Sequence, residues 1–188
     1  MEKIKDEEWE FNNKGKSLAF FAKKKQVAVS KEMTEELRKI SEEKGKATVR
    51  FCLNSAPDEE LQDMIILEFK ENKCRIPHKH IDGNEAIHVI KGKILALIFD
   101  DNGELIEKRI LSENGEFAYR NAQNRQHLYF PLSDYIIFRE IRGGKFIKEN
   151  LALPSWDFVK VLAEHIPKEE LICHNKLCKN PCKLLKID

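Results

Sequence analysis

The segment from residue 47 to residue 142 is the feature that most constrains the fold. It consists of short apolar runs separated by turn signals. Val49, Phe51 and Leu53 alternate with polar or small residues, a spacing typical of a half-buried strand. The run from 64 to 69 is continuously apolar apart from one glutamate, as expected for a buried strand. A series of short strands predicts a β-sandwich or a β-barrel.

Turn-forming residues divide the rest of this segment. They stand at Gly92, Asp101-Asn102-Gly103 and Asn114-Gly115. Asn-Gly favours a type I′ turn, because both residues accept a positive φ. The strands expected between and after these turns are 85–91, 93–99, 104–111, 127–131 and 134–142.

The regions before and after the β segment are less regular. Residues 31–44 predict a helix that Ser30 caps and Gly45 ends. Three apolar residues share one face of it: Met33, Leu37 and Ile40. Residues 1–29 allow either a short hairpin or a loosely docked extension. We therefore divide the chain into an N-terminal extension (1–46), a β-barrel (47–150) and a C-terminal part (151–188).

The C-terminal part predicts a helix followed by a cysteine-bearing tail. Pro154-Ser155 opens the helix, which runs to His165 before Pro167 ends it. Its expected apolar side is Trp156, Val159, Leu162 and Ala163. Cys173, Cys178 and Cys182 could hold a second metal together with His174, but their spacing lacks paired Cys-x2-Cys knuckles. Unligated thiols are the alternative.

Charge and hydropathy exclude several functional classes. The 33 basic and 32 acidic residues nearly cancel to a net charge of +1, which argues against a dedicated nucleic-acid binder. Apolar runs such as 94–99 are too short to span a membrane, and the acidic N-terminus does not resemble a signal peptide. We expect a cytoplasmic protein.

One short stretch carries candidate chemistry, Pro77-His78-Lys79-His80-Ile81-Asp82-Gly83-Asn84-Glu85. Residues two apart on a strand share a face, so His78 and His80 project together. Asp82-Gly83-Asn84 predicts a turn that brings Glu85 back beside them. Two imidazoles and a carboxylate form a suitable set for a divalent metal ion. His127 is the best candidate for a fourth ligand from a distant strand.

These residues resemble the first cupin motif from its histidines onward, namely His78, His80, Glu85 and Gly92, with Asn72 at the position of the leading glycine. The second motif is matched at Gly115 and His127. Between them Asn121 and Gln123 replace its proline and glycine, the spacing is one residue longer, and Pro131 stands near the asparagine position.

A closer resemblance, over about residues 30–150, is to the WbuC-type cupin-fold metalloproteins of bacterial O-antigen gene clusters. The stretches that carry it are 50–54, 63–99, 100–103 and 138–144. The resemblance implies a mainly β, cupin-type double-stranded β-helix (a jelly-roll barrel) with a short preceding helix and a helical C-terminal extension. It also implies a homodimer.

The resemblance and the ligand set lead to three functional hypotheses. The first is a metal-dependent isomerase or epimerase that acts on a sugar or nucleotide sugar in surface polysaccharide (O-antigen) biosynthesis. The second is an iron-dependent small-molecule dioxygenase. The third is a non-catalytic metal- or ligand-binding module. The divalent ion could be zinc, iron, manganese or nickel.

Further side chains are candidates for contact with the ligand. Tyr129 shares the strand face of His127 and could move a proton. Arg139 and Glu140 have opposite parity, and the resemblance favours Glu140 as the inward, catalytic one. Arg50 and Asn54 near the barrel entrance could hold an anionic sugar, and Arg139 is a third ligand-binding candidate. Solvated strand polarity explains these residues equally well.

Overall fold

The computed structural model describes residues 4–14, 17–55, 59–72, 76–145, 147 and 150–166. Its elements follow in the order β1 (Trp9–Asn12), β2 (Leu18–Ala22), α1 (Lys31–Glu43), β3 (Val49–Cys52), β4 (Leu61–Phe69), the 3₁₀ turn η1 (Lys70–Asn72), β5 (Lys79–His80), β6 (Glu85–Lys91), β7 (Lys93–Phe99), β8 (Leu105–Ser112), β9 (Ala118–Asn121), β10 (Gln126–Pro131), β11 (Tyr135–Gly143), β12 (Leu151–Ala152) and α2 (Phe158–Leu162). The mainly β fold predicted from the sequence is confirmed.

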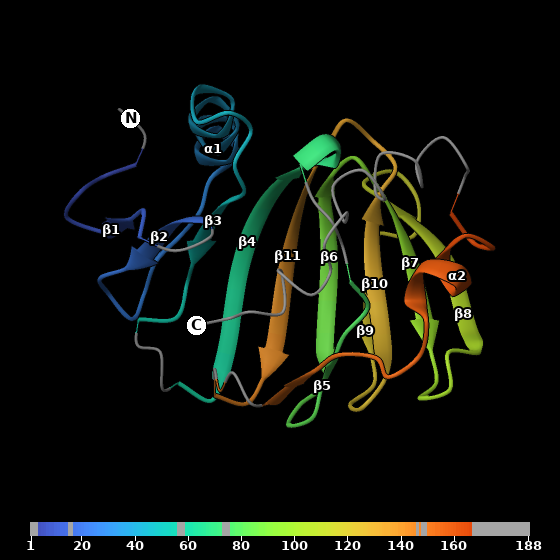
Figure 1. Ribbon diagram of the computed structural model, residues 1–188. Coiled ribbons are helices and arrows are strands. Elements are labelled where there is room, and N and C mark those ends of the chain that lie inside the picture. The colour runs from blue at the N-terminus through green and yellow to red at the C-terminus, as the bar shows by residue number, and fades with distance from the viewer. Residues whose placement is uncertain are drawn as a thin grey trace.

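Two sheets pack face to face and form a jelly-roll barrel. In the described residues the larger sheet has the order β1-β2-β3-β4-β11-β6-β9 and the smaller one the order β10-β7-β8. A short β5–β12 ladder extends the smaller sheet, because His78 forms a bridge to His127 at the start of β10. The two sheets lie beside one another in Figure 1. Apolar side chains from both sheets, including Ile87, Ile94 and Phe138, fill the space between them.

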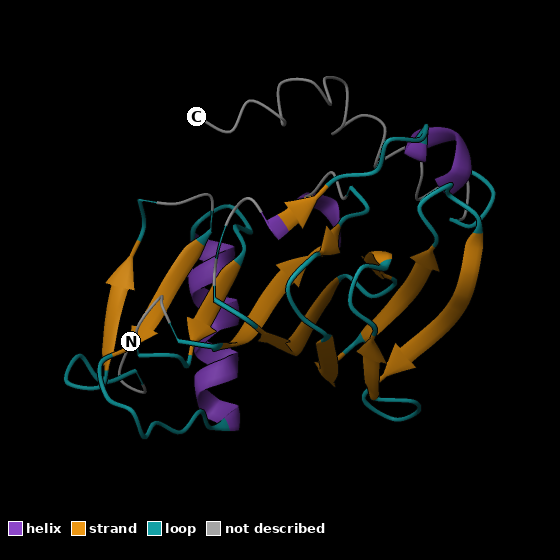
Figure 2. Ribbon diagram, turned by 90° about the horizontal axis from the view of Figure 1, so that it is seen from below, coloured by secondary structure: helices purple, strands orange, loops and turns teal. Residues whose placement is uncertain are grey.

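The two helices cover opposite parts of the barrel (Figures 1 and 2). Helix α1 begins after its N-cap Ser30, whose hydroxyl accepts a hydrogen bond from the Met33 amide at 3.3 Å. It buries Leu37 against the outer side of β3 and β4. Helix α2 and the residues around it pack on the outer side of β7 and β10. Because both helices pack on outer surfaces, the side chains of the strands line the interior between the sheets.

The N-terminal extension is part of the large sheet. Strands β1 and β2 form an antiparallel hairpin, and β2 pairs in parallel with β3. Trp9 and Phe20 are buried and both stack on Phe51, with ring centroids 4.6 and 5.4 Å away. Of the two alternatives for residues 1–29, the hairpin is the one observed.

Two local predictions were wrong. The C-terminal helix covers Phe158–Leu162 instead of 155–165, because the Asp157 side chain caps it by accepting from the Lys160 amide at 3.2 Å. Ala163, expected on its apolar side, is exposed. The 101–103 turn is not of type I′, since Gly103 has a positive φ of 90° but Asn102 does not. The Asp100 carboxylate holds this turn by accepting from the amides of Asn102 and Glu104.

Candidate metal centre

Backbone pairing brings His78 and His127 together, although 49 positions separate them in the numbering of the chain. The His78 amide donates to the His127 carbonyl at 3.1 Å, and the His127 amide donates to the His78 carbonyl at 2.9 Å. Their ring centroids lie 4.5 Å apart. The bridge therefore fixes two imidazoles from distant segments on one side of the ladder.

The turn after β5 returns the chain to the large sheet at Glu85. Gly143 holds this turn, since its amide donates to the Asn84 carbonyl at 3.1 Å. Gly83 packs against the Gly143 backbone so closely that a Cβ atom at Gly83 would overlap the carbonyl group of Gly143. The turn thus needs glycine for its close approach to the end of β11.

The side chains of these residues converge between the two sheets. The candidate ligand nitrogens of His78, His80 and His127 all lie within 4.8 Å of one another. Glu85 Oε2 lies 3.0 Å from His80 Nε2, and Glu85 Oε1 lies 3.3 Å from His127 Nε2. Three histidines in this arrangement can hold a metal ion, and the carboxylate stands beside two of them.

The hydrogen bonds on the far side of two of the rings suit a metal. Nδ1 of His78 lies 3.3 Å from the Ile76 carbonyl, and Nδ1 of His127 lies 3.0 Å from the Arg125 carbonyl. A carbonyl oxygen accepts only, so the Ile76 contact puts the His78 proton on Nδ1 and leaves Nε2 with a free lone pair. Metal-bound histidines usually have such a partner on the other nitrogen. At His127 the side-chain nitrogen of Asn121, a donor, lies 2.9 Å from the same Nδ1, so Nδ1 of this ring faces both an acceptor and a donor.

In the described part of the chain, two buried polar atoms at the centre of the histidine cluster lack a partner that a cation could supply. Glu85 Oε1 and His127 Nε2 are buried and have no hydrogen-bond partner among the described residues. When the His127 proton is on Nδ1, both atoms present lone pairs to one another across 3.3 Å. A proton or a metal ion between them relieves this repulsion. The donor set therefore fits a divalent cation.

Burial and mutual charge also keep His78 and Glu85 deprotonated. Burial and the charge of a protonated His127 together lower the pKa of His78 to about 3. Burial alone would raise the pKa of Glu85, but the His127 and His80 imidazoles bring it down to about 2. Metal ligands must be deprotonated. At neutral pH His78 and Glu85 are ready to bind.

Tyr129 and Glu140 lie next to the cluster inside the barrel. The Tyr129 ring is buried, with its centroid 5.1 Å from that of His127. Burial and the negative charge of Glu85 raise its pKa well above the ordinary value, so it keeps its proton. Glu140 shares a strand face with Phe138, which packs between the sheets. Burial, together with the charges of Glu85 and Glu68, raises the pKa of Glu140 to about 8.

The three residues predicted to bind a ligand lie in different places. Arg50 alternates with Val49 and Phe51, which pack toward α1, so it faces the barrel interior. Asn54 is buried just beyond β3. Arg139 lies on the outer face of the sheet and forms a bidentate ion pair with Asp63, at 2.8 and 2.5 Å. The described contacts join none of them directly to the histidines.

The sequence prediction missed two side chains that touch the cluster, Asn121 at His127 and Arg142 at His80. Arg142 is 4% exposed, and its Nη1 lies 3.2 Å from His80 Nδ1. It is also 3.5 Å from Asp82 Oδ1 in the turn. The signal was available, because Arg142 is two residues after Glu140 and therefore on the same strand face. The predicted tail site at Cys173, Cys178 and Cys182 lies outside the described residues.

Comparison with known proteins finds one family model that matches part of the chain. Residues 29–111 match the model of a family described as a domain of unknown function, DUF6016. This match spans α1, the first half of the barrel and three of the candidate ligands: His78, His80 and Glu85. No curated protein matches the sequence.

Solved structures resemble the chain at low identity. A structural-genomics target from Shewanella oneidensis is 13% identical with a TM-score of 0.47, over 64% of this chain and 75% of that one. KdgF from Halomonas sp. is 17% identical with a TM-score of 0.41, over 52% and 81%. Oxalate decarboxylase from Bacillus subtilis is 16% identical with a TM-score of 0.45, over 75% and 34%.

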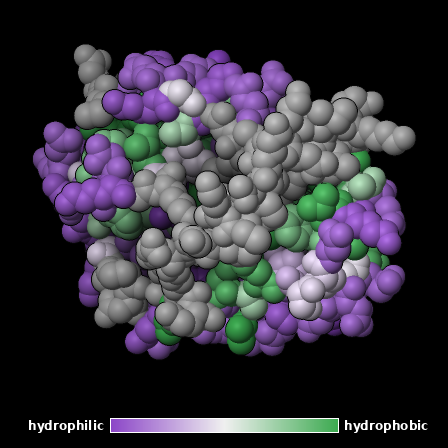
Figure 3. Space-filling view, in the orientation of Figure 1, coloured by the Kyte–Doolittle hydropathy of each residue, from purple (hydrophilic) through white to green (hydrophobic). Residues whose placement is uncertain are grey.

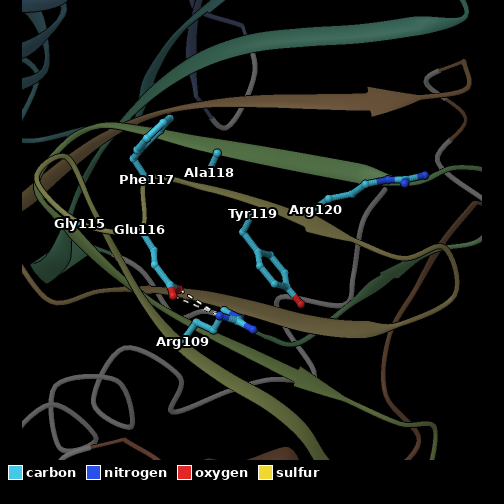
Figure 4. Close-up of a pocket in the computed structure, with 7 residues that line it drawn as sticks. All are labelled: Arg109, Gly115, Glu116, Phe117, Ala118, Tyr119 and Arg120. Carbon is cyan, nitrogen blue, oxygen red and sulfur yellow. Dashed lines mark hydrogen bonds and ion pairs between the residues drawn. The ribbon is translucent and has the colours of Figure 1, made fainter.

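The surface adds two observations. A pocket of about 380 Å³ opens where β8 and β9 face each other, away from the histidines, and an Arg109–Glu116 ion pair crosses it (Figure 4). Apolar surface is interspersed with hydrophilic side chains on the face shown in Figure 3. Among the described residues, no helix has the length and apolar character needed to cross a membrane.

Proposed function

We propose that this protein is a metal-dependent cupin enzyme that moves a proton on a small oxygen-rich ligand inside the barrel. The observation that carries the proposal is Glu140. Its pKa of about 8 lets it give or take a proton near neutral pH, and it lies among the side chains that face the histidine cluster. A carboxyl group held this way is suited to general acid–base chemistry.

His78, His80, His127 and Glu85 would hold the ion. A divalent ion bound there would polarise a carbonyl or hydroxyl oxygen of the ligand and so acidify a neighbouring C–H bond. Ionised Glu140 can then accept that proton, and its protonated form can return it to the adjacent carbon in an isomerisation, whereas an epimerisation takes the returning proton from a donor on the opposite face. Tyr129, which keeps its proton, donates a hydrogen bond to a ligand oxygen. Together these roles describe an isomerase or an epimerase.

The proposed substrate is a sugar or nucleotide sugar. The resemblance to WbuC-type proteins supports this class, a role in O-antigen biosynthesis and a homodimeric assembly. Arg50 supports an anionic substrate: its Nε is buried without a hydrogen-bond partner among the described residues, and its Nη1 has only the Met64 sulfur at 3.8 Å. Asn54 would contribute an amide from just beyond the other end of β3. Arg139 has no part in this proposal, because Asp63 engages it on the outer face.

The first test is metal content. Protein purified without chelators is expected to contain one divalent ion per chain by elemental analysis, and His80→Ala is expected to lose it. His165→Ala is the matched control, since His165 lies on the far side of the smaller sheet near Phe99. Equal metal content in wild type and His80→Ala would refute the metal site.

The second test is proton exchange. Metal-loaded protein is incubated with a panel of sugars and nucleotide sugars in deuterium oxide, and deuterium at carbon is followed by mass spectrometry. Wild type is expected to label at least one of them, and Glu140→Gln to label none. Oxygen uptake by the iron-loaded protein without such labelling would favour the dioxygenase. Bound metal with neither activity would favour the binding module.

A further inference from the structure

We propose that Arg142 is a positioning residue that holds the metal-free site closed by selecting the tautomer of His80. The proposal rests on the metal site proposed above and concerns how a cation enters it. By donating to His80 Nδ1, the guanidinium acts together with Glu85, the acceptor on the other side of the ring, to keep the ring proton on Nε2. A divalent cation can take that nitrogen only when Arg142 moves off the ring.

Hydrogen-bond chemistry assigns the tautomer. A guanidinium group donates and has no acceptor, so Nδ1 of His80, 3.2 Å from Arg142 Nη1, must carry the lone pair. The proton of the neutral ring is then on Nε2, which donates to Glu85 Oε2 at 3.0 Å.

His78 has the opposite tautomer. The Ile76 carbonyl oxygen faces its Nδ1, and this hydrogen bond leaves Nε2 of the ring free. In the closed state the site thus offers the His78 lone pair, while His80 and Glu85 satisfy each other. Full coordination requires the His80 proton to shift from Nε2 to Nδ1.

Arg142 has other partners that can retain it when it leaves the ring. Asp82 Oδ1 lies 3.5 Å from its Nη1, and the Lys145 carbonyl accepts from its Nη2 at 3.4 Å. Asp82 is itself fixed by the Asn150 side-chain amide at 2.8 Å. The guanidinium can therefore exchange one partner for another without losing its hydrogen bonds. In the closed site the Arg142 side chain contacts His80, and in the open site it would contact only Asp82 and the Lys145 carbonyl.

The tautomer is measured directly by long-range proton–nitrogen correlation of the histidine rings in the metal-stripped full-length protein. We expect Nε2–H for His80 and Nδ1–H for His78, with His127 read in the same spectrum, and a larger Nδ1–H population of His80 in Arg142→Met, where Glu85 alone opposes the proton shift. Arg120→Met, the same substitution on the outward face of β9, is the control and should change none of the three. Nδ1–H on His80 in the wild type would overturn the proposal.

Zinc affinity, measured by competition with a chelator, tests the consequence. Arg142→Met should bind zinc about tenfold more tightly than wild type, within the range that ligand-supporting residues typically produce. Removing a positive charge could produce the same gain, so Arg142→Lys is measured as well. In both variants the zinc affinity must rise with the Nδ1–H population of His80. A gain in affinity with the His80 tautomer unchanged, or a loss of affinity, contradicts the proposal.

These readouts separate the two proposals. If wild type and Arg142→Met both fail to bind zinc, manganese, nickel or iron(II), the proposed metal site fails and so does the gating role of Arg142. If wild type binds metal but Arg142→Met binds it equally or more weakly, the metal site stands and the closing role of Arg142 is refuted. Binding by Arg142→Met but not by wild type supports both.

Discussion

The hydroxyl of Tyr119 donates to Glu107 Oε2 at 2.7 Å and so joins the edge strand β9 of the large sheet to the edge strand β8 of the small one. The hydrogen bond lowers the pKa of Glu107, and the Arg109 side chain lowers it further. Burial and the same hydrogen bond raise the pKa of Tyr119. The contact closes the barrel along a seam where the described strands form no backbone ladder.

Tyr119→Phe is therefore expected to destabilise the fold by about 1 kcal/mol, the usual net value of a hydrogen bond to a charged group that is partly exposed. Urea unfolding at pH 7 measures the change. Glu107→Gln and the double variant complete a cycle. The two single effects should be less than additive in the double variant, and strict additivity would show that the hydrogen bond contributes nothing.

Gly83→Ala tests the turn that carries the candidate ligands. The added Cβ would overlap the Gly143 carbonyl, and backbone atoms on both sides leave little room to shift. We expect a loss of about 2 kcal/mol or more, as for overpacking at a rigid site, together with weaker zinc binding. Gly45→Ala is a useful comparison, because a Cβ there meets nothing within 4 Å and its strain comes from φ alone. Unchanged zinc affinity in Gly83→Ala would show that the turn does not place His80 and Glu85.

His127 is the candidate ligand from the distant strand, and its removal is compared with that of His88. His127 is 1% exposed and faces the cluster, whereas His88 lies exposed on the outer face beside Phe117. His127→Gln should lose bound metal and His88→Gln should retain it, by elemental analysis after gel filtration. Circular dichroism confirms that each variant is folded. Full metal occupancy in His127→Gln would remove it from the ligand set.

Glu140 predicts a pH dependence of stability in the metal-free protein. Its pKa is raised from 4.5 to about 8, so between these values the unfolded chain releases a proton that the folded chain keeps. Stability attributable to this group therefore falls as pH rises from 5 to 8, by something on the order of 3 kcal/mol after allowance for partial exposure. In Glu140→Gln this part of the slope should disappear.

The measurement is the melting temperature of both proteins from pH 5 to pH 8. The wild type should lose stability relative to Glu140→Gln as the pH rises, and the difference between the two proteins isolates Glu140 from other titrating groups. Glu104→Gln, at an exposed position, is the control. Parallel curves for wild type and Glu140→Gln would show that Glu140 titrates as an ordinary carboxyl group.

Local patterns predicted most of the barrel. Alternation and turn residues predicted β6 and β7 with the bounds that the structure has, because Gly92 turns the chain with a positive φ of 87°. They predicted the helix α1 within one residue because its cap and apolar face are local. The bounds of α2 failed because the Asp157 cap competes with the earlier start at Ser155.

The candidate site was predictable where its residues are neighbours in sequence. The turn between His80 and Glu85 is short enough to be recognised from residue type. The support around it depends on tertiary contacts between segments about 60 or more residues apart, such as Arg142 on His80 and Asn150 on Asp82. No local period encodes these, and an arginine on an inward face looks from the sequence like a solvated strand residue. The opposite parity of Arg139 and Glu140 was readable, but the Asp63 partner of Arg139 was not.

The double hydrogen bond between His78 and His127 has a mechanical consequence. It makes the two imidazoles a single stiff unit attached to the smaller sheet, while Glu85 belongs to the larger sheet. An ion held by both would cross-link the two sheets, so its removal would loosen the whole end of the barrel that carries the site rather than one loop. The hydrogen-exchange rates of backbone amides in β6 and β10 would then rise together. Binding or loss of one ion would change the stability of both sheets.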